Sequence, residues 1–295
     1  MTYTLETLIS TISDIYTHQD DYEMSKHLVD FHAPDGTYIG DYFNLFIHER
    51  MVNQAPKMYH IWGPYDLVSK KAPQRATVYQ NGVLLINQDI THEINVRTAA
   101  MNFVVLSALW IRDLSDKKIL LYWSGNVWKE FLKLLKEYDW SVTTMSYSNT
   151  KGPNMEFEAL GASIGVACTY FTWDSLHQYD LVVLLTNSRN PVITKEMFAT
   201  IKKTAIVTSF IGSQPQGELE SSIYNKEVQI VVDRDQTLVY AKDLSAQIEN
   251  GNVSKDSILT IEDLLQGKKT NPGSIIIYRS TWAPMQSLAI VKLLW

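Results

Sequence analysis

Apolar runs of strand length alternate with segments of helical period between residues 113 and 270. The run 119–122 is uniformly apolar, and after Gly125 apolar residues recur at the three- and four-residue intervals of a helix. Further strands are predicted at 140–145, 163–170, 180–186, 205–210 and 228–233, and further helices at 155–160, 196–203 and 261–265. Alternation of this kind predicts a parallel sheet covered by helices.

The first third of the chain has a different pattern. Residues 4–16 and 95–109 have helical spacing, whereas the charged segment 18–32 is expected to be helix or loop. Short strands are predicted at 38–47, 58–62, 65–69, 76–79 and 83–86. The last two flank Asn81-Gly82, a dipeptide typical of a type I′ hairpin turn. We therefore predict an antiparallel meander over 38–90, and a final strand and helix at 274–279 and 285–294.

Composition limits the class of protein. The chain has 295 residues, which suggests two domains, and a formal net charge of -6 without a basic run, which argues against nucleic acid and anionic membranes as partners. No apolar run is long enough to span a bilayer. The single cysteine, Cys168, cannot form a disulfide within the chain, so a cytoplasmic location is expected. Cys168 and the seven histidines form no metal-binding pattern, and no metal site is predicted.

The turn after the first strand of the alternating region is a candidate site. In a dinucleotide-binding unit this turn is rich in glycine, because backbone N–H groups at the start of the helix must approach a pyrophosphate. Here Trp123 stands where the first glycine is expected, and Gly125 is retained. Ser124, Gly125 and Asn126 are therefore candidates for a phosphate cradle. An ordinary strand–helix turn is the alternative.

Six short segments occur along the chain in this order: Arg-Thr-Ala-Ala at 97–100, Thr-Asn-Ser-Arg-Asn-Pro-Val at 186–192, Gly-Ser-Gln-Pro followed by Glu-Leu at 212–219, Val-Val-Asp at 231–233, Leu-Leu-Gln-Gly at 264–267 and Tyr-Arg-Ser at 278–280. In this order they resemble the ornithine cyclodeaminase/mu-crystallin family, from about Leu84 to the C-terminus. The resemblance implies an α/β fold with a Rossmann-type parallel-sheet domain over 113–270. It also implies a discontinuous α+β domain, formed by 1–112 and 271–295, for dimerisation and substrate binding.

The same resemblance implies a homodimer that binds NAD(P) and acts on a small amino acid, imine or keto acid. Lys70 and Arg97 match positions that bind substrate in the family, and Arg97 could hold a carboxylate through two hydrogen bonds. Other interpretations stay open from the residues alone. Arg97 could instead form an ion pair with Glu93 or Asp89, and Lys70, beside Lys71, could be a solvated surface residue.

Three further residues match positions beside the cofactor: Thr186, Ser188 and Ser280. For Thr186 and Ser188, ordinary turn and cap chemistry is the alternative. Two departures from the family pattern bear on the cofactor. Trp123 and Trp282 both replace glycines that face it, so NAD(P) binding could have been lost.

Two other departures narrow the chemistry. Ser213 or Gln214 stands where cyclodeaminases carry an aspartate, and neither can act as a carboxylate general base, so cyclodeamination is not expected. Residues 146–149 offer neither an acid for a ribose hydroxyl nor an arginine for a 2′-phosphate. Three functions remain: a divergent NAD(P)-dependent oxidoreductase, a pseudoenzyme that serves as a partner subunit of another protein, and a small-ligand binding protein.

Overall fold

The computed structural model divides into two compact units, Met1–Arg97 with Pro284–Trp295, and Thr98–Ala283. The residues it describes are 3–35, 38–50, 57–66, 73–172, 176–186, 188, 190–210, 217–281 and 284–294. No helix among these residues is long and apolar enough to cross a bilayer. Lys70, Ser213, Gln214 and Trp282 lie outside the described residues.

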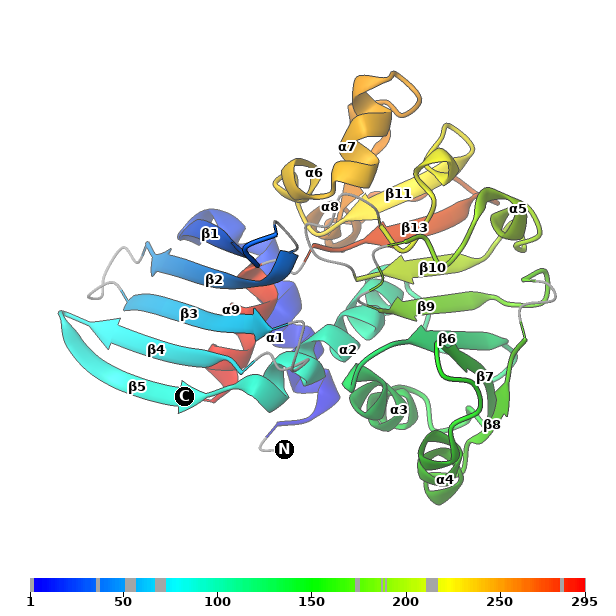
Figure 1. The fold of residues 1–295 in the computed structure, drawn as a ribbon, viewed down its shortest axis with the longest axis horizontal. Coiled ribbons are helices and arrows are strands. Elements are labelled where there is room, and N and C mark those ends of the chain that lie inside the picture. The colour runs from blue at the N-terminus through cyan, green and yellow to red at the C-terminus, as the bar shows by residue number, and fades with distance from the viewer. Residues whose placement is uncertain are drawn as a thin grey trace. The chain divides into compact units, whose positions relative to one another are not determined.

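The first unit contains an antiparallel sheet of five strands in the order β1-β2-β3-β4-β5 (Figure 1). Side chains on one face are buried, including Leu45, Ile47 and Ile61, and α9 contacts β2 and α1. The elements are α1 (Leu5–Thr17), η1 (Gln19–Asp21), β1 (Tyr22–His32), β2 (Tyr38–Glu49), β3 (Lys57–Asp66), β4 (Arg75–Gln80), β5 (Val83–Asp89), the first part of α2 (Thr91–Ala108), and α9 (Pro284–Leu293).

The predicted meander is present, with two corrections. The segment 18–32, expected to be helix or loop, contains the edge strand β1; its many polar and charged residues conceal the period of two. The strand predicted at 58–62 and the first two residues of the strand predicted at 65–69 belong to the single strand β3, and 67–69 lie outside the described residues. β4 pairs only with 57–62 of β3, so Pro64 has a strand neighbour on one side alone, where it stands opposite Tyr42 of β2. Gly63 is required there, since a Cβ would lie 2.1 Å from the Pro73 carbonyl oxygen.

The second unit contains an eight-stranded parallel sheet in the order β12-β11-β13-β10-β9-β6-β7-β8 (Figure 1). The predicted α/β fold with a Rossmann-type sheet is thus confirmed. Its elements are β6 (Ile119–Trp123), α3 (Val127–Tyr138), β7 (Thr144–Asn149), α4 (Met155–Ser163), β8 (Ala167–Tyr170), β9 (Leu181–Leu185), α5 (Lys195–Phe198), β10 (Ile206–Ser209), η2 (Ser221–Ile223), β11 (Val228–Val232), α6 (Thr237–Tyr240), α7 (Lys242–Glu249), η3 (Lys255–Ser257), β12 (Leu259–Thr260), α8 (Ile261–Leu265) and β13 (Ile275–Arg279).

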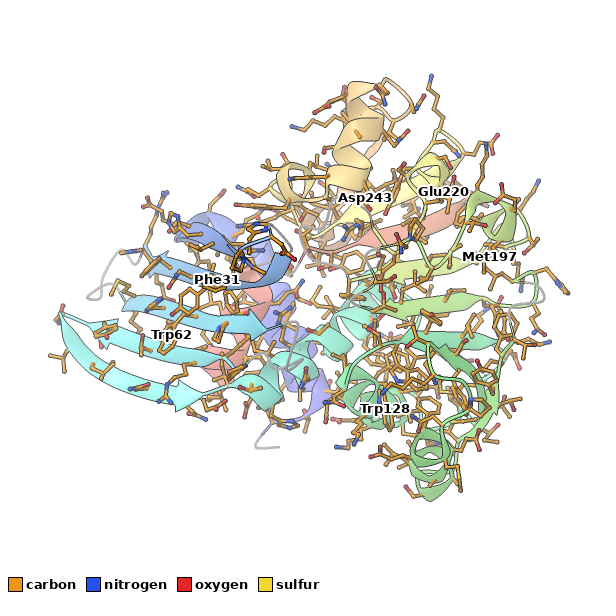
Figure 2. The ribbon with its side chains drawn as sticks, in the orientation of Figure 1. Phe31, Trp62, Trp128, Met197, Glu220 and Asp243 are labelled. Carbon is orange, nitrogen blue, oxygen red and sulfur yellow. The ribbon has the colours of Figure 1, made fainter. Side chains whose placement is uncertain are left out.

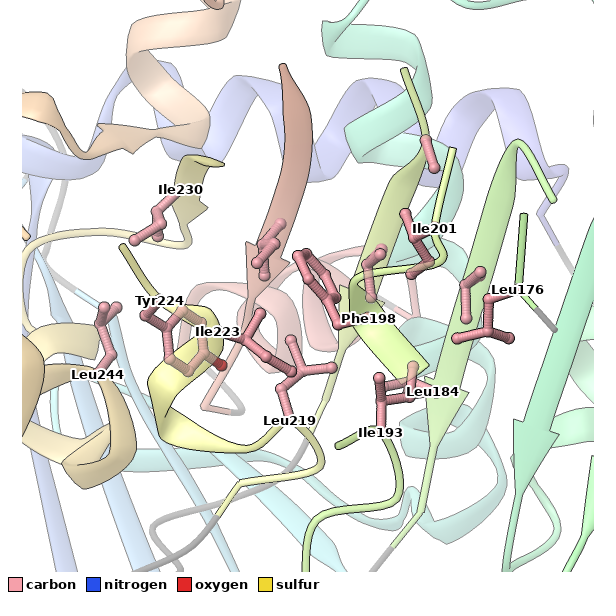
Figure 3. Close-up of a cluster of buried hydrophobic side chains, with 14 of the residues drawn as sticks. Leu176, Leu184, Ile193, Phe198, Ile201, Leu219, Ile223, Tyr224, Ile230 and Leu244 are labelled. Carbon is pink, nitrogen blue, oxygen red and sulfur yellow. The ribbon is translucent and has the colours of Figure 1, made fainter. Parts of the chain in front are cut away.

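The central strands β6, β9 and β10 are buried at every residue, as expected for a parallel sheet with both faces covered. On one face a cluster that includes Leu184, Ile193, Leu219 and Tyr224 forms the core (Figure 3). Because neighbouring side chains of a strand point to opposite faces, Tyr122 joins this cluster and Trp123 lies on the other face.

Four sequence predictions for this unit need correction. The strand predicted at 163–170 begins at Ala167, because α4 extends to Ser163. The strand predicted at 140–145 begins at Thr144, after a turn at 139–142 in which Asp139 accepts from Ser141. The helix predicted at 196–203 is the short α5. The strand β13, expected to belong with the N-terminal part of the chain, pairs with β10 and β11 in the parallel sheet. The domain limits at 112/113 and 270/271 otherwise stay a prediction.

Candidate functional site

The strand order reverses between β6 and β9, and this point defines the candidate site. From β6 the chain proceeds outward through β7 and β8, then returns to β9 on the other side of β6. Trp123 is in register with Leu185, and the Ser124 N–H donates to the Leu185 carbonyl oxygen at 3.3 Å. Ligands of open parallel sheets bind beyond the carboxyl ends of the strands at such a reversal.

The turn at this point is open. Ser124, Gly125 and Asn126 are all exposed, and a Cβ added to Gly125 would meet no heavy atom within 4 Å. Asn126 is the N-cap of α3, and its side chain makes no capping hydrogen bond. Packing therefore does not require glycine at 125, and the backbone at the start of a 12-residue helix is accessible to an anion. These features fit a dinucleotide pyrophosphate.

The ring of Trp123 does not occupy the space above this turn. It is 4% exposed and stacks on Phe157 of α4, with ring centroids 4.5 Å apart. Trp128 of α3, labelled in Figure 2, and Tyr147 of β7 complete the cluster, with centroids 5.7 and 5.3 Å from Trp123. The indole has thus become part of the core beneath α3 and α4. Trp123 alone gives no reason to exclude a cofactor.

A buried carboxylate joins the ends of β9 and β10. Glu218 accepts hydrogen bonds from the Thr186 N–H (2.6 Å), the Ser209 hydroxyl (2.8 Å) and the Phe210 N–H (2.9 Å). Burial raises the pKa of the Glu218 carboxyl, an effect that the hydrogen bonds from Thr186 and Ser209 oppose. The carboxylate fixes the position of Thr186 beside the open turn.

Thr186 and Ser188 are engaged in a local turn. The Thr186 hydroxyl oxygen accepts from the Ser188 N–H at 3.2 Å, and the Ser188 hydroxyl donates to the Asn190 carbonyl oxygen at 2.6 Å. These bonds are the turn chemistry considered from the sequence. The backbone of Thr186 still lies at the end of β9, next to the residues of the open turn.

Ser280 follows β13 at the same edge of the sheet. It is fully buried, and its hydroxyl donates to Asp233 at 2.8 Å. Asp233 also accepts from the Thr281 N–H at 3.2 Å and from the Tyr278 hydroxyl. The Ser280 hydroxyl therefore supports the end of β11, and a role toward a cofactor stays a prediction.

A third buried carboxylate was not predicted as part of the site. Asp243 of α7 (Figure 2) accepts two hydrogen bonds of 3.1 Å from Arg279, and one of 3.2 Å from the Tyr224 hydroxyl. Although burial lowers the pKa of the Arg279 guanidinium, the Asp243 carboxylate outweighs that effect and raises it. A Cβ at Gly217 would lie 2.0 Å from this carboxylate, so a side chain at 217 would displace it. The sequence offered no local signal for this pair, which lies 36 residues apart.

Arg97 belongs to the first unit. It is 2% exposed, and its Nη1 donates to Oε1 of Gln286 in α9 at 2.6 Å. The amide of Gln286 in turn faces the Tyr16 hydroxyl at 3.5 Å. Asp89, considered as an ion-pair partner of Arg97, accepts from the Thr91 N–H at 2.9 Å.

These features define a Rossmann-type sheet with an open turn at its reversal point. Neither the protein-family models nor the curated protein sequences compared with the chain give a match. Solved structures do. Delta(1)-pyrroline-2-carboxylate reductase of Thermococcus litoralis, in complex with NADH and L-proline, has a TM-score of 0.80 at 14% identity, over 99% of this chain and 93% of that one.

Two further structures have the same fold. The iminosuccinate reductase of Paracoccus denitrificans, in complex with NAD+, has a TM-score of 0.79 at 14% identity, over 99% of this chain and 92% of that one. A probable ornithine cyclodeaminase from Bordetella pertussis Tohama I has a TM-score of 0.77 at 18% identity, over 98% and 89%. The chain thus has the fold of ornithine cyclodeaminase-like enzymes, and the predicted resemblance is confirmed at the level of fold.

Proposed function

We propose that the protein is an NAD(P)-dependent oxidoreductase acting on a small amino acid, imine or keto acid. The observation that carries the proposal is the open turn of Ser124, Gly125 and Asn126 at the point where the strand order reverses. The likeness of fold to two reductases solved with nicotinamide cofactors supports it. The bound cofactor would supply or accept hydride, and the chain would bind and orient the reactants.

In this proposal the backbone N–H groups that begin α3 hold the pyrophosphate. Gly125 permits the close approach, because a side chain there would project into the space the phosphates need. Thr186, held by Glu218, would form the neighbouring wall at the end of β9. Ser188 and Ser280 remain candidates farther along the same edge.

Arg97 is the proposed ligand of the substrate carboxylate. Arg97 is buried and its Nη1 contacts the side chain of Gln286, and the planar guanidinium suits a carboxylate. Cyclodeamination is not part of the proposal, because Ser213 and Gln214 offer no carboxylate base. Lys70 is proposed as a second substrate contact on the basis of sequence resemblance alone.

A titration with NADH and NADPH, followed through tryptophan fluorescence, tests the proposal. We expect saturable binding by the wild-type protein and a loss of at least about tenfold in affinity for Gly125→Val, whose side chain enters open space in the free protein but the phosphate path in the complex. Ala159→Val, on the exposed side of α4, is the matched control and should bind normally. Absence of binding by the wild type would contradict the proposal and favour the pseudoenzyme alternative.

We also propose a homodimer formed through the sheet of the first unit. Both edge strands expose large apolar side chains, among them Phe31 of β1 (43%, Figure 2) and Val83 of β5 (60%). The face opposite α9 carries a row of half-buried rings in which Phe46 stacks on His60 at 4.4 Å and Trp62 follows. A second copy of the chain would cover this face and the apolar side chains of the edge strands. Light scattering during size exclusion should give the mass of two chains, and the mass of one chain would contradict the dimer.

A further inference from the structure

The end of β7 carries a feature that bears on which nicotinamide cofactor would bind. β7 is the neighbour of β6, and Asn149, its last residue, is in register with Trp123. The turn after β7 therefore lies beside the open turn after β6. In Rossmann-type sites the residues that follow this strand contact the ribose that bears a 2′-hydroxyl in NAD and a 2′-phosphate in NADP.

Asn149 fixes the shape of this turn. Its Oδ1 accepts from the Lys151 N–H at 2.7 Å, and its Nδ2 donates to the Gly152 carbonyl oxygen at 2.8 Å. Gly152 has a φ of +87°, a left-handed conformation that favours glycine. With the asparagine side chain directed back into its own turn, Thr150 and Lys151 are left exposed. The surface of the turn thus offers a hydroxyl and an ammonium group.

Carboxylates are absent from this part of the sequence. No aspartate or glutamate occurs between Ser141 and Met155. The first acids of α4 have other partners: Glu156 accepts from Lys129 at 2.5 Å, and Glu158 accepts from the Tyr147 hydroxyl. An acid in the turn would bind the ribose hydroxyls of NAD and repel a 2′-phosphate. Here a 2′-phosphate would meet a cation and a hydroxyl donor.

We propose that the turn of Asn149, Thr150 and Lys151 recognises a 2′-phosphate, so that the protein prefers NADP(H) to NAD(H), with Lys151 as the specificity-determining residue. This inference rests on the proposed function. It assigns a role to a segment in which the sequence shows neither the acid typical of NAD sites nor the arginine typical of NADP sites. A lysine supplies the same charge as arginine, although without the planar fork.

The test compares dissociation constants for NADPH and NADH, measured by calorimetry. We expect the wild type to bind NADPH at least about tenfold more tightly, the effect of one charge-assisted hydrogen bond. Lys151→Glu should remove this preference by weakening NADPH, while Lys151→Arg should retain it. Lys203→Glu, the same charge change at another exposed lysine, should leave it unchanged. Added salt should reduce the preference, because the contact is exposed.

The outcomes separate the two proposals. Equal or tighter binding of NADH by the wild type, or an NADPH preference that survives Lys151→Glu, would overturn the assignment of the 2′-phosphate site and leave the oxidoreductase proposal standing. Failure of both nucleotides to bind would overturn the oxidoreductase proposal itself.

Discussion

The carboxyl edge of the parallel sheet has two halves that differ in how their ends are held. Beyond β6 the turn is exposed, and the N-cap of α3 makes no side-chain hydrogen bond. Beyond β9, β10, β11 and β13 the chain is tied down by three buried carboxylates, Glu218, Asp233 and Asp243. One half exposes the backbone at the start of a helix, whereas the other uses its polar groups internally.

The two halves of this edge therefore suit different roles: one fixes side chains in place, and the other is accessible to a ligand. A buried carboxylate with several hydrogen bonds fixes loops that would otherwise move, because leaving any partner unpaired is costly. The half of the edge that contains the buried carboxylates, called the braced half below, can therefore hold Thr186 and Ser280 in constant positions. The open half keeps its helix start free for a ligand that would itself supply the negative charge.

The largest expected effect on stability comes from removing a buried carboxylate of the braced half. Asp243→Ala removes the carboxylate that pairs with the fully buried Arg279 and should lower the free energy of unfolding by about 3–5 kcal/mol, because the guanidinium charge loses this ion pair inside the protein. Urea unfolding measures the change. Asp256→Ala, at an exposed carboxylate, is the control and should stay within about 0.5 kcal/mol. A small effect of Asp243→Ala would mean that Arg279 finds another partner or solvent.

Much of the fold was predictable because its signals are local. β9 is an uninterrupted apolar run, α3 has a clear helical period, and Asn81-Gly82 forms the expected turn, with φ of 52° and 75°. The edge strand β1 was missed, because an edge strand with few buried residues has no strong alternation. β13 could not be assigned to its sheet, since its pairing with β10 joins distant parts of the chain.

Breaking the core beneath the open turn should reduce stability without improving binding. Trp123→Ala removes an indole stacked on Phe157 and should lower the free energy of unfolding by about 3–5 kcal/mol. Affinity for NAD(P)H should not rise, because the indole does not fill the turn. Trp140→Ala is the matched control: its side chain is 81% exposed, and little change is expected. Tighter cofactor binding by Trp123→Ala would show that the indole obstructs the site.

The candidate site was predictable only in part, because its open half is formed by neighbours in sequence and its braced half by residues far apart in the chain. Strand, glycine and helix are neighbours in sequence, so the open turn at Gly125 could be found from its pattern. The direction of the Trp123 side chain could not, because it depends on the space between α3 and α4. Glu218 lies 32 residues from Thr186, and a pairing over that distance leaves no periodic signal.

The smallest expected effect is a pH dependence that distinguishes two nearby glutamates. Burial raises the pKa of Glu218 in the folded state above its ordinary 4.5. The folded protein therefore binds this proton more tightly than the unfolded chain does, so the stability contribution is full below pH 4.5 and is lost as the pH rises through the raised value. Glu218→Gln should abolish this slope and cost about 1–3 kcal/mol, because an amide N–H would face the Phe210 N–H donor.

Glu220, two residues away (Figure 2), is the matched control of opposite sign. Hydrogen bonds from Ser222 and from the Lys195 N–H lower its pKa below 4.5. Its contribution is present above pH 4.5 and is lost as the pH falls, so Glu220→Gln should affect only the acid limb. Unfolding by urea between pH 3 and 8, at about one-unit steps, separates the two slopes. A Glu218→Gln protein whose stability keeps the wild-type dependence above pH 4.5 would show that the buried carboxylate does not titrate there.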